Sequence, residues 1–186
     1  HEWHRAELRQ TRKQGPEYMN SPQLSLSRRL RKSPFETRSH VGATSASVYN
    51  HVVLPTVYES LEADYWHLRE HVQIWDVACQ VQVEVRGPDA LNFVEFLTPR
   101  DVSKCVPGQC IYAPLLDEHA GVVNDPIILC LSTDHYWLSI SDSDVLLWAK
   151  GLAVGGGFDV EVHDPDVFPL SLQGPKSETL LSRLIA

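Results

Sequence analysis

The feature that most constrains the fold is a series of short apolar segments, each closed by turn-forming residues. Residues 77–87 (VACQVQVEVRG) alternate valine with polar residues, the period-two pattern of a half-buried strand. The other segments of this kind are residues 110–116, 121–132, 135–141, 158–164 and 167–174. Turn clusters such as DEHAG separate them. Strands this short, joined by turns, favour antiparallel hairpins.

Four other segments have the character of helices. Residues 56–76 place Leu61, Tyr65 and Leu68 on one face, and residues 88–102 show apolar residues at helical spacing until a proline stops them. Residues 142–157 open with capping residues and end in glycines, and residues 175–186 begin another helix. We assign Trp137 and Trp148 to the core. The order of elements predicts an α+β fold, a mainly antiparallel sheet with packed helices.

A chain of 186 residues with 43% hydrophobic residues is long enough for one domain with tails. Residues 1–26 lack a periodic apolar face, and the sole methionine of the chain, Met19, lies within them. We therefore expect a disordered or extraneous N-terminal tail there. We expect residues 27–186 to form the domain. Because the chain ends at residue 186, when the last helical pattern has only just begun, we expect the domain to be truncated at its C-terminus.

The charge distribution argues against nucleic-acid binding by the domain. Residues 1–38 hold nine of the sixteen Lys and Arg against four of the twenty-four acids, which leaves the rest of the chain strongly acidic. The basic cluster at residues 28–32 is interpreted as a solvated arm. No apolar run suits a membrane span or a signal peptide, so the expected location is cytoplasmic.

The chain lacks the common signatures of nucleotide, serine-hydrolase and zinc sites. It contains no GxxxxGK[ST], GxGxxG, GxSxG or HExxH motif, and its nine histidines and four cysteines match no metal-ligand spacing. We therefore expect free thiols and no metal. Glycines 155–157 follow a helical segment and are interpreted as a C-cap rather than a phosphate cradle.

Three stretches carry a resemblance to a known family: RGPDAL at residues 86–91, residues 98–127 (TPRDVSKCVPGQCIYAPLLDEHAGVVNDPI), and LQGPKS at residues 172–177. With them, residues 27–181 resemble the aminomethyltransferase, or glycine-cleavage T-protein, family. The resemblance implies the N-terminal folate-binding domain of the aminomethyltransferase fold and tetrahydrofolate as cofactor. It also implies a one-carbon transferase, an enzyme that this stretch alone does not complete.

Within that family, the chain resembles the dimethylsulfoniopropionate demethylase branch. The segments SRRLRKSPF, residues 47–78 and WLSISDSDVLLWAKGLA carry this likeness. Glycine-cleavage enzymes usually have paired aspartates where this chain has Asn124 and Asp125, and a DSHM run where it has DVAC at residues 76–79. An asparagine cannot titrate, whereas methyl transfer from a sulfonium mainly needs alignment. Asn124→Asp is accordingly expected to leave methyl transfer within about tenfold.

The resemblance also implies roles for individual residues. Tyr112 matches a tyrosine that lines the folate pocket, Asp125 matches an aspartate that hydrogen-bonds the pterin, and Asn124 lies beside it; Asn124 and Asp125 are also the catalytic candidates. Ser139 and Ile140 lie where the family's backbone approaches the pterin.

By the same resemblance, Tyr49, Asn50 and His51 fall where the family's N-terminal segment borders the substrate end of the pocket. An aromatic face there would attract a sulfonium by about 0.5–2 kcal/mol. Tyr49 and His51 are therefore the substrate-binding candidates. The leading hypothesis is methyl transfer from a small sulfonium such as dimethylsulfoniopropionate to tetrahydrofolate. The expected partners are the methyl donor and folate, with neither nucleic acid nor membrane. Two alternatives stay open: an aminomethyltransferase or N-demethylase of the same family, and a non-catalytic folate-binding iron–sulfur assembly factor.

Overall fold

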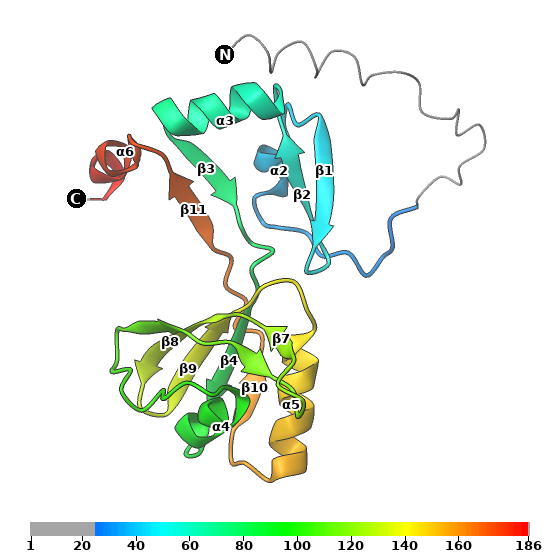
Figure 1. Cartoon of the computed structure of the whole chain (residues 1–186). Helices are drawn as coiled ribbons and strands as arrows, with labels where there is room; N and C mark the ends of the chain where they lie inside the picture. The colour runs from blue at the N-terminus through cyan, green and yellow to red at the C-terminus, as the bar shows by residue number, and fades with distance from the viewer. Residues whose placement is uncertain (1–24, 186) are drawn as a thin grey trace, which may run out of the picture.

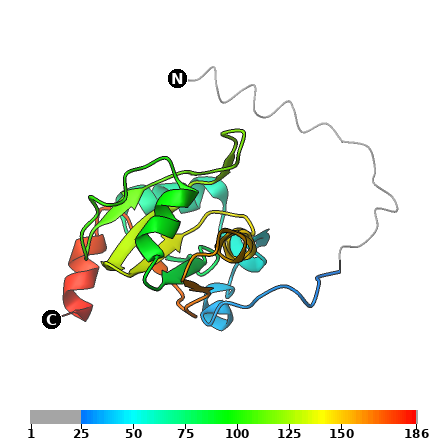
Figure 2. The same ribbon diagram turned by 90° about the horizontal axis from the view of Figure 1, so that it is seen from below.

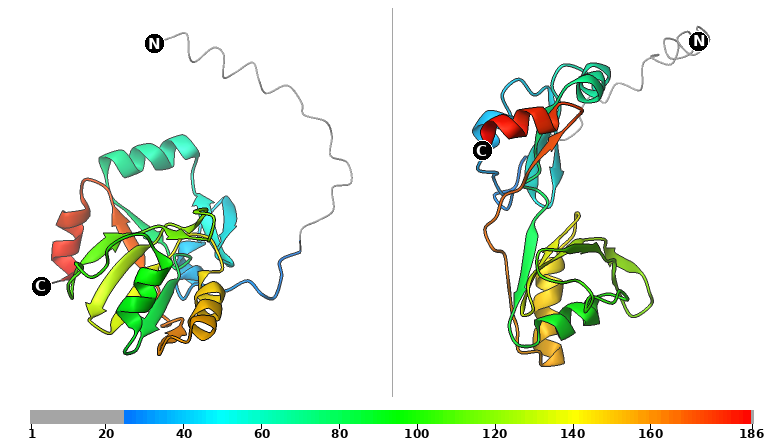
Figure 3. Two further views of the ribbon diagram at one scale, coloured as in Figure 1. Left: turned by 60° about the horizontal axis from the view of Figure 1, so that its bottom comes forward. Right: turned by 90° about the vertical axis from the view of Figure 1, so that its left-hand side faces the viewer.

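The computed structural model describes residues 25–185. Its elements form two groups, a lower one around a five-stranded sheet and an upper one of small sheets and helices (Figure 1). Two connections, residues 77–81 and 164–169, run between the groups (Figures 1 and 3). The expected tail at residues 1–26 lies, apart from its last two residues, outside the described part. No helix among residues 25–185 is long and apolar enough to cross a bilayer.

The lower sheet has the strand order β10-β4-β9-β8-β5, and all neighbours pair antiparallel. Its strands are β4 (Gln82–Arg86), β5 (Cys110–Tyr112), β8 (Ile127–Ser132), β9 (His135–Ser139) and β10 (Glu161–His163). A short hairpin of β6 (Leu115–Leu116) and β7 (Val122–Asn124) links β5 to β8. The predicted α+β class with a mainly antiparallel sheet is confirmed.

Helices α4 (Ala90–Leu97) and α5 (Val145–Gly156) cover one face of this sheet (Figure 2). The strands turn their alternate apolar residues toward the helices, as the period-two pattern predicts. Val83 and Val85 of β4, Leu138 of β9 and Phe93 of α4 are fully buried in this core. Gly157, in the left-handed conformation at φ 69°, ends α5 and confirms the predicted C-cap.

The upper group contains a hairpin of β1 (Ser45–Tyr49) and β2 (Val52–Val57), and a second pair of β3 (Gln73–Asp76) and β11 (Leu170–Gln173). Helices α2 (Glu36–Ser39), α3 (Leu61–Glu70) and α6 (Ser177–Leu184) complete it. None of these helices buries a residue, and apolar side chains such as Leu61, Trp66 and Ile74 are more than half exposed.

The helix predicted for residues 56–76 is wrong at both ends. Residues 56–57 finish strand β2, and the helix begins only after Ser60, whose hydroxyl accepts a hydrogen bond from the Ala63 backbone N–H at 3.1 Å. It ends at Glu70, and residues 73–76 form β3 because they pair with β11, almost a hundred residues later. The β1–β2 hairpin was not predicted either, because residues 52–57 (VVLPTV) do not alternate polar and apolar residues.

Candidate functional site

Asn124 and Asp125 lie where β7 ends, beside the loop that leads into α5. Asn124 is buried, 5% exposed, and its amide group is fully engaged with this loop. Its Nδ2 donates to the Ser141 carbonyl at 3.1 Å and to Ser143 Oγ at 2.8 Å, while its Oδ1 accepts from the Ser141 backbone N–H at 3.0 Å. Asp125 is exposed, and among residues 25–185 its carboxylate is engaged through Oδ1 alone, which accepts from Ser141 Oγ at 2.6 Å.

A second buried asparagine, Asn50, belongs to the upper group and forms hydrogen bonds with the same loop. Its Nδ2 donates to the carbonyls of Cys79 at 2.9 Å and Ser141 at 3.0 Å, and its Oδ1 accepts from the Ser143 backbone N–H at 2.9 Å. The Asn50 backbone N–H donates to Asp142 Oδ1 at 2.8 Å. The sequence analysis places Asn50 at the substrate end of the pocket but does not count it among the substrate-binding candidates.

The substrate-binding candidates Tyr49 and His51 flank Asn50 at the tip of the β1–β2 hairpin. Asn50 and His51 form a two-residue loop with φ of 46° and 63°, the left-handed geometry that tight hairpins require. Tyr49 is half-buried at the end of β1. The His51 ring nitrogen Nε2 lies 3.3 Å from Asp144 Oδ1, at the start of α5. The structure thus brings the hairpin tip and the loop beside Asn124 and Asp125 together.

Tyr112 and Asp125 share one face of the five-stranded sheet, the face opposite α4 and α5. Asp125 and Ile127 are exposed while Pro126 and Ile128 are buried, so the chain alternates regularly along this stretch. Tyr112 is the register partner of Ile127 and is 54% exposed. Partners opposite each other in antiparallel strands point to the same side, so Tyr112 and Asp125 face the same surface.

Ser139 belongs to this row, whereas the side chain of Ile140 does not. Ser139 is the register partner of both Ile127 and Gln82, and its Oγ accepts from Gln82 Nε2 at 3.0 Å. Ile140 is 4% exposed in the core, and its backbone N–H donates to the Val81 carbonyl. Any contact of Ile140 with a ligand on the open face therefore has to come from its backbone.

The same open face carries a cluster of one glutamate and two histidines that the sequence does not suggest. Glu84, only 8% exposed, accepts from Trp137 Nε1 at 2.9 Å, and its two carboxylate oxygens contact Nε2 of His135 and, at 2.5 Å, Nε2 of His163. Burial opposes ionisation of Glu84, but the hydrogen bonds from Trp137 and His135 and the charge of His163 outweigh it and lower its pKa. The assignment of Trp137 to the core is wrong, because the residue pairs on the face away from the helices.

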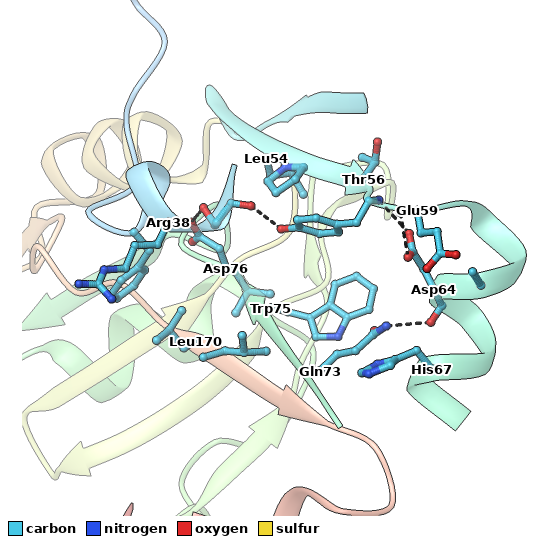
Figure 4. Close-up of a pocket in the computed structure, with 17 residues that line it drawn as sticks. Arg38, Leu54, Thr56, Glu59, Asp64, His67, Gln73, Trp75, Asp76 and Leu170 are labelled. Atoms are coloured by element: carbon cyan, nitrogen blue, oxygen red, sulfur yellow. Dashed lines mark hydrogen bonds between the residues drawn. The ribbon is translucent and has the colours of Figure 1, made fainter. Parts of the chain in front are cut away.

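A cavity of about 730 Å³ lies in the upper group between α2, β2, α3, β3 and β11 (Figure 4). Trp75, Leu54 and Leu170 give it apolar walls, and the carboxylates of Asp64 and Asp76 lie at its sides. None of the site residues predicted from the sequence lines this cavity. The chain segments that form it are far apart in the sequence, so no local pattern signals it.

Hydrogen bonds hold the polar wall of this cavity in place. The Tyr58 hydroxyl donates to the Ser39 carbonyl, and Ser39 Oγ donates to Asp76 Oδ2 at 2.9 Å. Asp64 accepts from the Tyr58 backbone N–H at 2.9 Å, and its own carbonyl accepts from Gln73 Nε2 at 2.8 Å. Burial, reinforced by the negative charges of Asp76 and Asp64, raises the pKa of the Tyr58 hydroxyl.

All four cysteines are free, as expected. Burial raises the pKa of Cys79 and of Cys105, which disfavours the reactive thiolate form. Within residues 25–185, no group of three or more His, Cys, Asp or Glu side chains is arranged to hold a metal ion.

Comparison with known proteins gives a consistent set of relatives. The model of a family described as the GCVT N-terminal domain matches residues 35–186. The chain is 48% identical over 159 residues to the dimethylsulfoniopropionate demethylase DmdA of Ruegeria pomeroyi, covering 85% of this chain and 44% of that protein. It is 33% identical over 136 residues to the aminomethyltransferase of Alkaliphilus metalliredigens, covering 70% of this chain and 36% of that protein.

Among solved structures, the glycine cleavage system aminomethyltransferase T from Bartonella henselae has the same fold, with a TM-score of 0.74 and 23% sequence identity. The match covers 83% of this chain and 43% of that structure. The chain therefore spans less than half the length of these relatives.

Proposed function

The chain belongs to the aminomethyltransferase, or glycine-cleavage T-protein, family, and from this membership we propose that it is part of a tetrahydrofolate-dependent methyltransferase. The donor we propose is a small sulfonium such as dimethylsulfoniopropionate. The observation that carries the proposal is the 48% identity to a dimethylsulfoniopropionate demethylase over 85% of this chain, against 33% to an aminomethyltransferase. The activity is that of the complete polypeptide, and a cytoplasmic location belongs to the same proposal.

Tyr112, Asp125 and Ser139 are the residues that would hold the pterin. They share the open face of the sheet, where the exposed Tyr112 ring offers a flat apolar surface. Asp125 Oδ2 has no hydrogen bond among the described residues and is free to accept one from a pterin N–H. An exposed aromatic ring beside a hydrogen-bond acceptor fits a pterin ring with its N–H groups. When bound, the cofactor supplies the nucleophilic nitrogen N5. We retain the backbone of Ile140 as a further candidate contact with the pterin.

The environment of Asn124 supports methyl transfer over chemistry that needs a titrating group. Its amide forms three hydrogen bonds with the loop of residues 141–143, so both its nitrogen and its oxygen are engaged, and an amide does not titrate. We assign it the task of holding Asp125 and this loop rather than that of an acid or base. Asp125 in turn orients the cofactor.

The reaction that we propose balances without an acid catalyst. The carbon–sulfur bond breaks with its electron pair left on sulfur, the methyl carbon bonds to N5, and N5 loses its proton to solvent or to a nearby carboxylate. The sulfonium is already activated by its positive charge, so the protein contributes alignment. Tyr49 and His51 would line the donor end, where the aromatic ring of Tyr49 favours a cation by about 0.5–2 kcal/mol.

The test is a donor comparison with the complete polypeptide. Dimethylsulfoniopropionate with tetrahydrofolate is expected to yield 5-methyltetrahydrofolate and the demethylated thioether in equal amounts. Ammonia release from an aminomethyl-lipoyl donor, with no turnover of any sulfonium, would favour the aminomethyltransferase alternative instead. Folate binding without turnover of either donor would favour the non-catalytic alternative.

A further inference from the structure

The tip of the β1–β2 hairpin and the loop of residues 141–143 come from different groups of elements, yet they lie side by side (Figure 1). Partly buried hydrogen bonds join them. We infer that Asn50 is a positioning residue for the reaction: it fixes the hairpin tip, and with it Tyr49 and His51, against the loop that holds Asn124 and Asp125. This inference rests on the proposed function, because it concerns the alignment of the donor end with the folate end.

The two asparagines are joined through shared atoms. The Ser141 carbonyl accepts from Asn50 Nδ2 at 3.0 Å and from Asn124 Nδ2 at 3.1 Å. Ser143 donates its backbone N–H to Asn50 Oδ1 at 2.9 Å and accepts at its Oγ from Asn124 Nδ2 at 2.8 Å. Both asparagines are 5% exposed. A shift of the hairpin tip therefore has to move the loop, and with it the hydrogen bond from Ser141 Oγ to Asp125.

Position 50 needs the properties of asparagine in particular. Its φ of 46° lies in the left-handed region, which favours Gly, Asn and Asp. Its side chain must also donate toward the carbonyls of Cys79 and Ser141 and accept from Ser143. Glycine satisfies only the backbone. Aspartate supplies an acceptor but no donor, and it adds a charge within reach of Asp142. Asparagine alone meets both demands.

The expected consequence is a loss of alignment rather than a loss of binding. The Asn50 side chain points into protein and contacts backbone groups, so its removal deletes none of the side chains of Tyr49, Tyr112 and Asp125 that are candidate ligand contacts. A misplacement of about 1 Å between reacting groups can lower the rate by roughly a hundredfold. Loss of an interaction that acts on alignment lowers kcat more than it raises KM.

The variant to test is Asn50→Gly, which keeps the left-handed backbone and removes only the side chain. Ala120→Gly is the matched control, since Ala120 also has a positive φ, of 63°, in an exposed hairpin turn outside the site. Amide hydrogen exchange on the 186-residue chain should become at least about tenfold faster at Ser143 in Asn50→Gly, because its N–H loses its acceptor. Ala120→Gly should leave that rate unchanged.

Kinetics of the complete polypeptide provide the second readout. Asn50→Gly should lower kcat by roughly tenfold to a hundredfold with KM for folate changed less than about threefold, and Asn50→Asp should not rescue it. If the wild type turns over only an aminomethyl donor, the proposed function fails, and the same kcat comparison with that donor still decides the role of Asn50. Unchanged Ser143 exchange, or unchanged kcat with whichever donor is active, would overturn the inference.

Discussion

Replacing Asn124 with aspartate probes the closed hydrogen-bond environment at the centre of the candidate site. The change keeps the size of the side chain and its ability to accept from the Ser141 N–H. It removes the two N–H groups of Asn124 Nδ2, which in the wild type donate to the Ser141 carbonyl and to Ser143 Oγ. The sequence-based expectation that Asn124→Asp leaves methyl transfer within about tenfold considers the size of the side chain and its hydrogen-bond acceptance. The structure adds two donated hydrogen bonds that the aspartate would lose.

The size of the effect follows from these contacts. Each lost hydrogen bond costs about 1 kcal/mol, and Ser143 recovers one of them by turning its hydroxyl to donate. The carboxylate is also buried, 5% exposed in the parent residue, and faces a carbonyl oxygen. An uncompensated buried charge costs about 3–5 kcal/mol. We therefore expect Asn124→Asp to lower the free energy of unfolding by about 3 kcal/mol or more at pH 7.

The penalty should depend on pH in a defined direction. Burial and the facing carbonyl raise the pKa of the new carboxyl above about 3.9, the ordinary value for aspartate. A folded-state pKa above the unfolded one means that stability is lost as pH rises, so the deficit relative to the wild type should shrink toward pH 4, where the protonated acid donates to the carbonyl.

Urea unfolding of the 186-residue chain at pH 7 and near pH 4 measures this. Asp125→Asn is the matched control, because the side chain is exposed and its amide oxygen still accepts from Ser141 Oγ. It should cost less than about 1 kcal/mol. An Asn124→Asp variant within about 0.5 kcal/mol of the wild type at pH 7 would refute the argument.

Two further stability predictions follow. Gly87→Ala should lower the free energy of unfolding by about 2 kcal/mol or more, because φ is 144° and a Cβ would lie 2.5 Å from the Asp159 carbonyl oxygen. Gly155→Ala, in open space on α5, should raise the free energy of unfolding by about 0.5–1 kcal/mol. Thermal melts compare the two variants, and equal shifts of the melting temperature would contradict the prediction. Glu84→Gln should lower the free energy of unfolding by about 1–3 kcal/mol at pH 7. Because the pKa of Glu84 is lowered in the folded protein, its carboxylate stabilises the fold above the ordinary pKa of 4.5, and this stabilisation is lost as the pH falls below that value. The stability of the variant should therefore depend less steeply on pH in acid unfolding, and an unchanged slope would contradict this.

The sheet was predictable from the sequence because its strands have a local signature. The alternation along residues 81–86 correctly separates Val83 and Val85, which face the helices, from Glu84, which faces away. The burial of Glu84 was not predictable in the same way. It depends on His135, Trp137 and His163, which arrive from neighbouring strands more than fifty residues away.

The candidate site was partly predictable for the same reason. Asn124 and Asp125 stand out through family resemblance, and Tyr112 shares a face with Asp125 because of strand register. The role of Asn50 depends on contacts with residues 141–143, about ninety positions along the chain, which no local pattern encodes. The upper cavity likewise requires the pairing of β3 with β11, and the predicted helix over residues 56–76 obscured that strand.

The most direct test of the central claim is a single-turnover label transfer. The complete polypeptide is mixed with tetrahydrofolate and dimethylsulfoniopropionate whose sulfonium methyl groups carry deuterium, and the folate product is analysed by mass spectrometry. The account predicts 5-methyltetrahydrofolate with the intact labelled methyl group, formed together with one equivalent of labelled thioether. Demethylation of the donor with no label in the folate would contradict it.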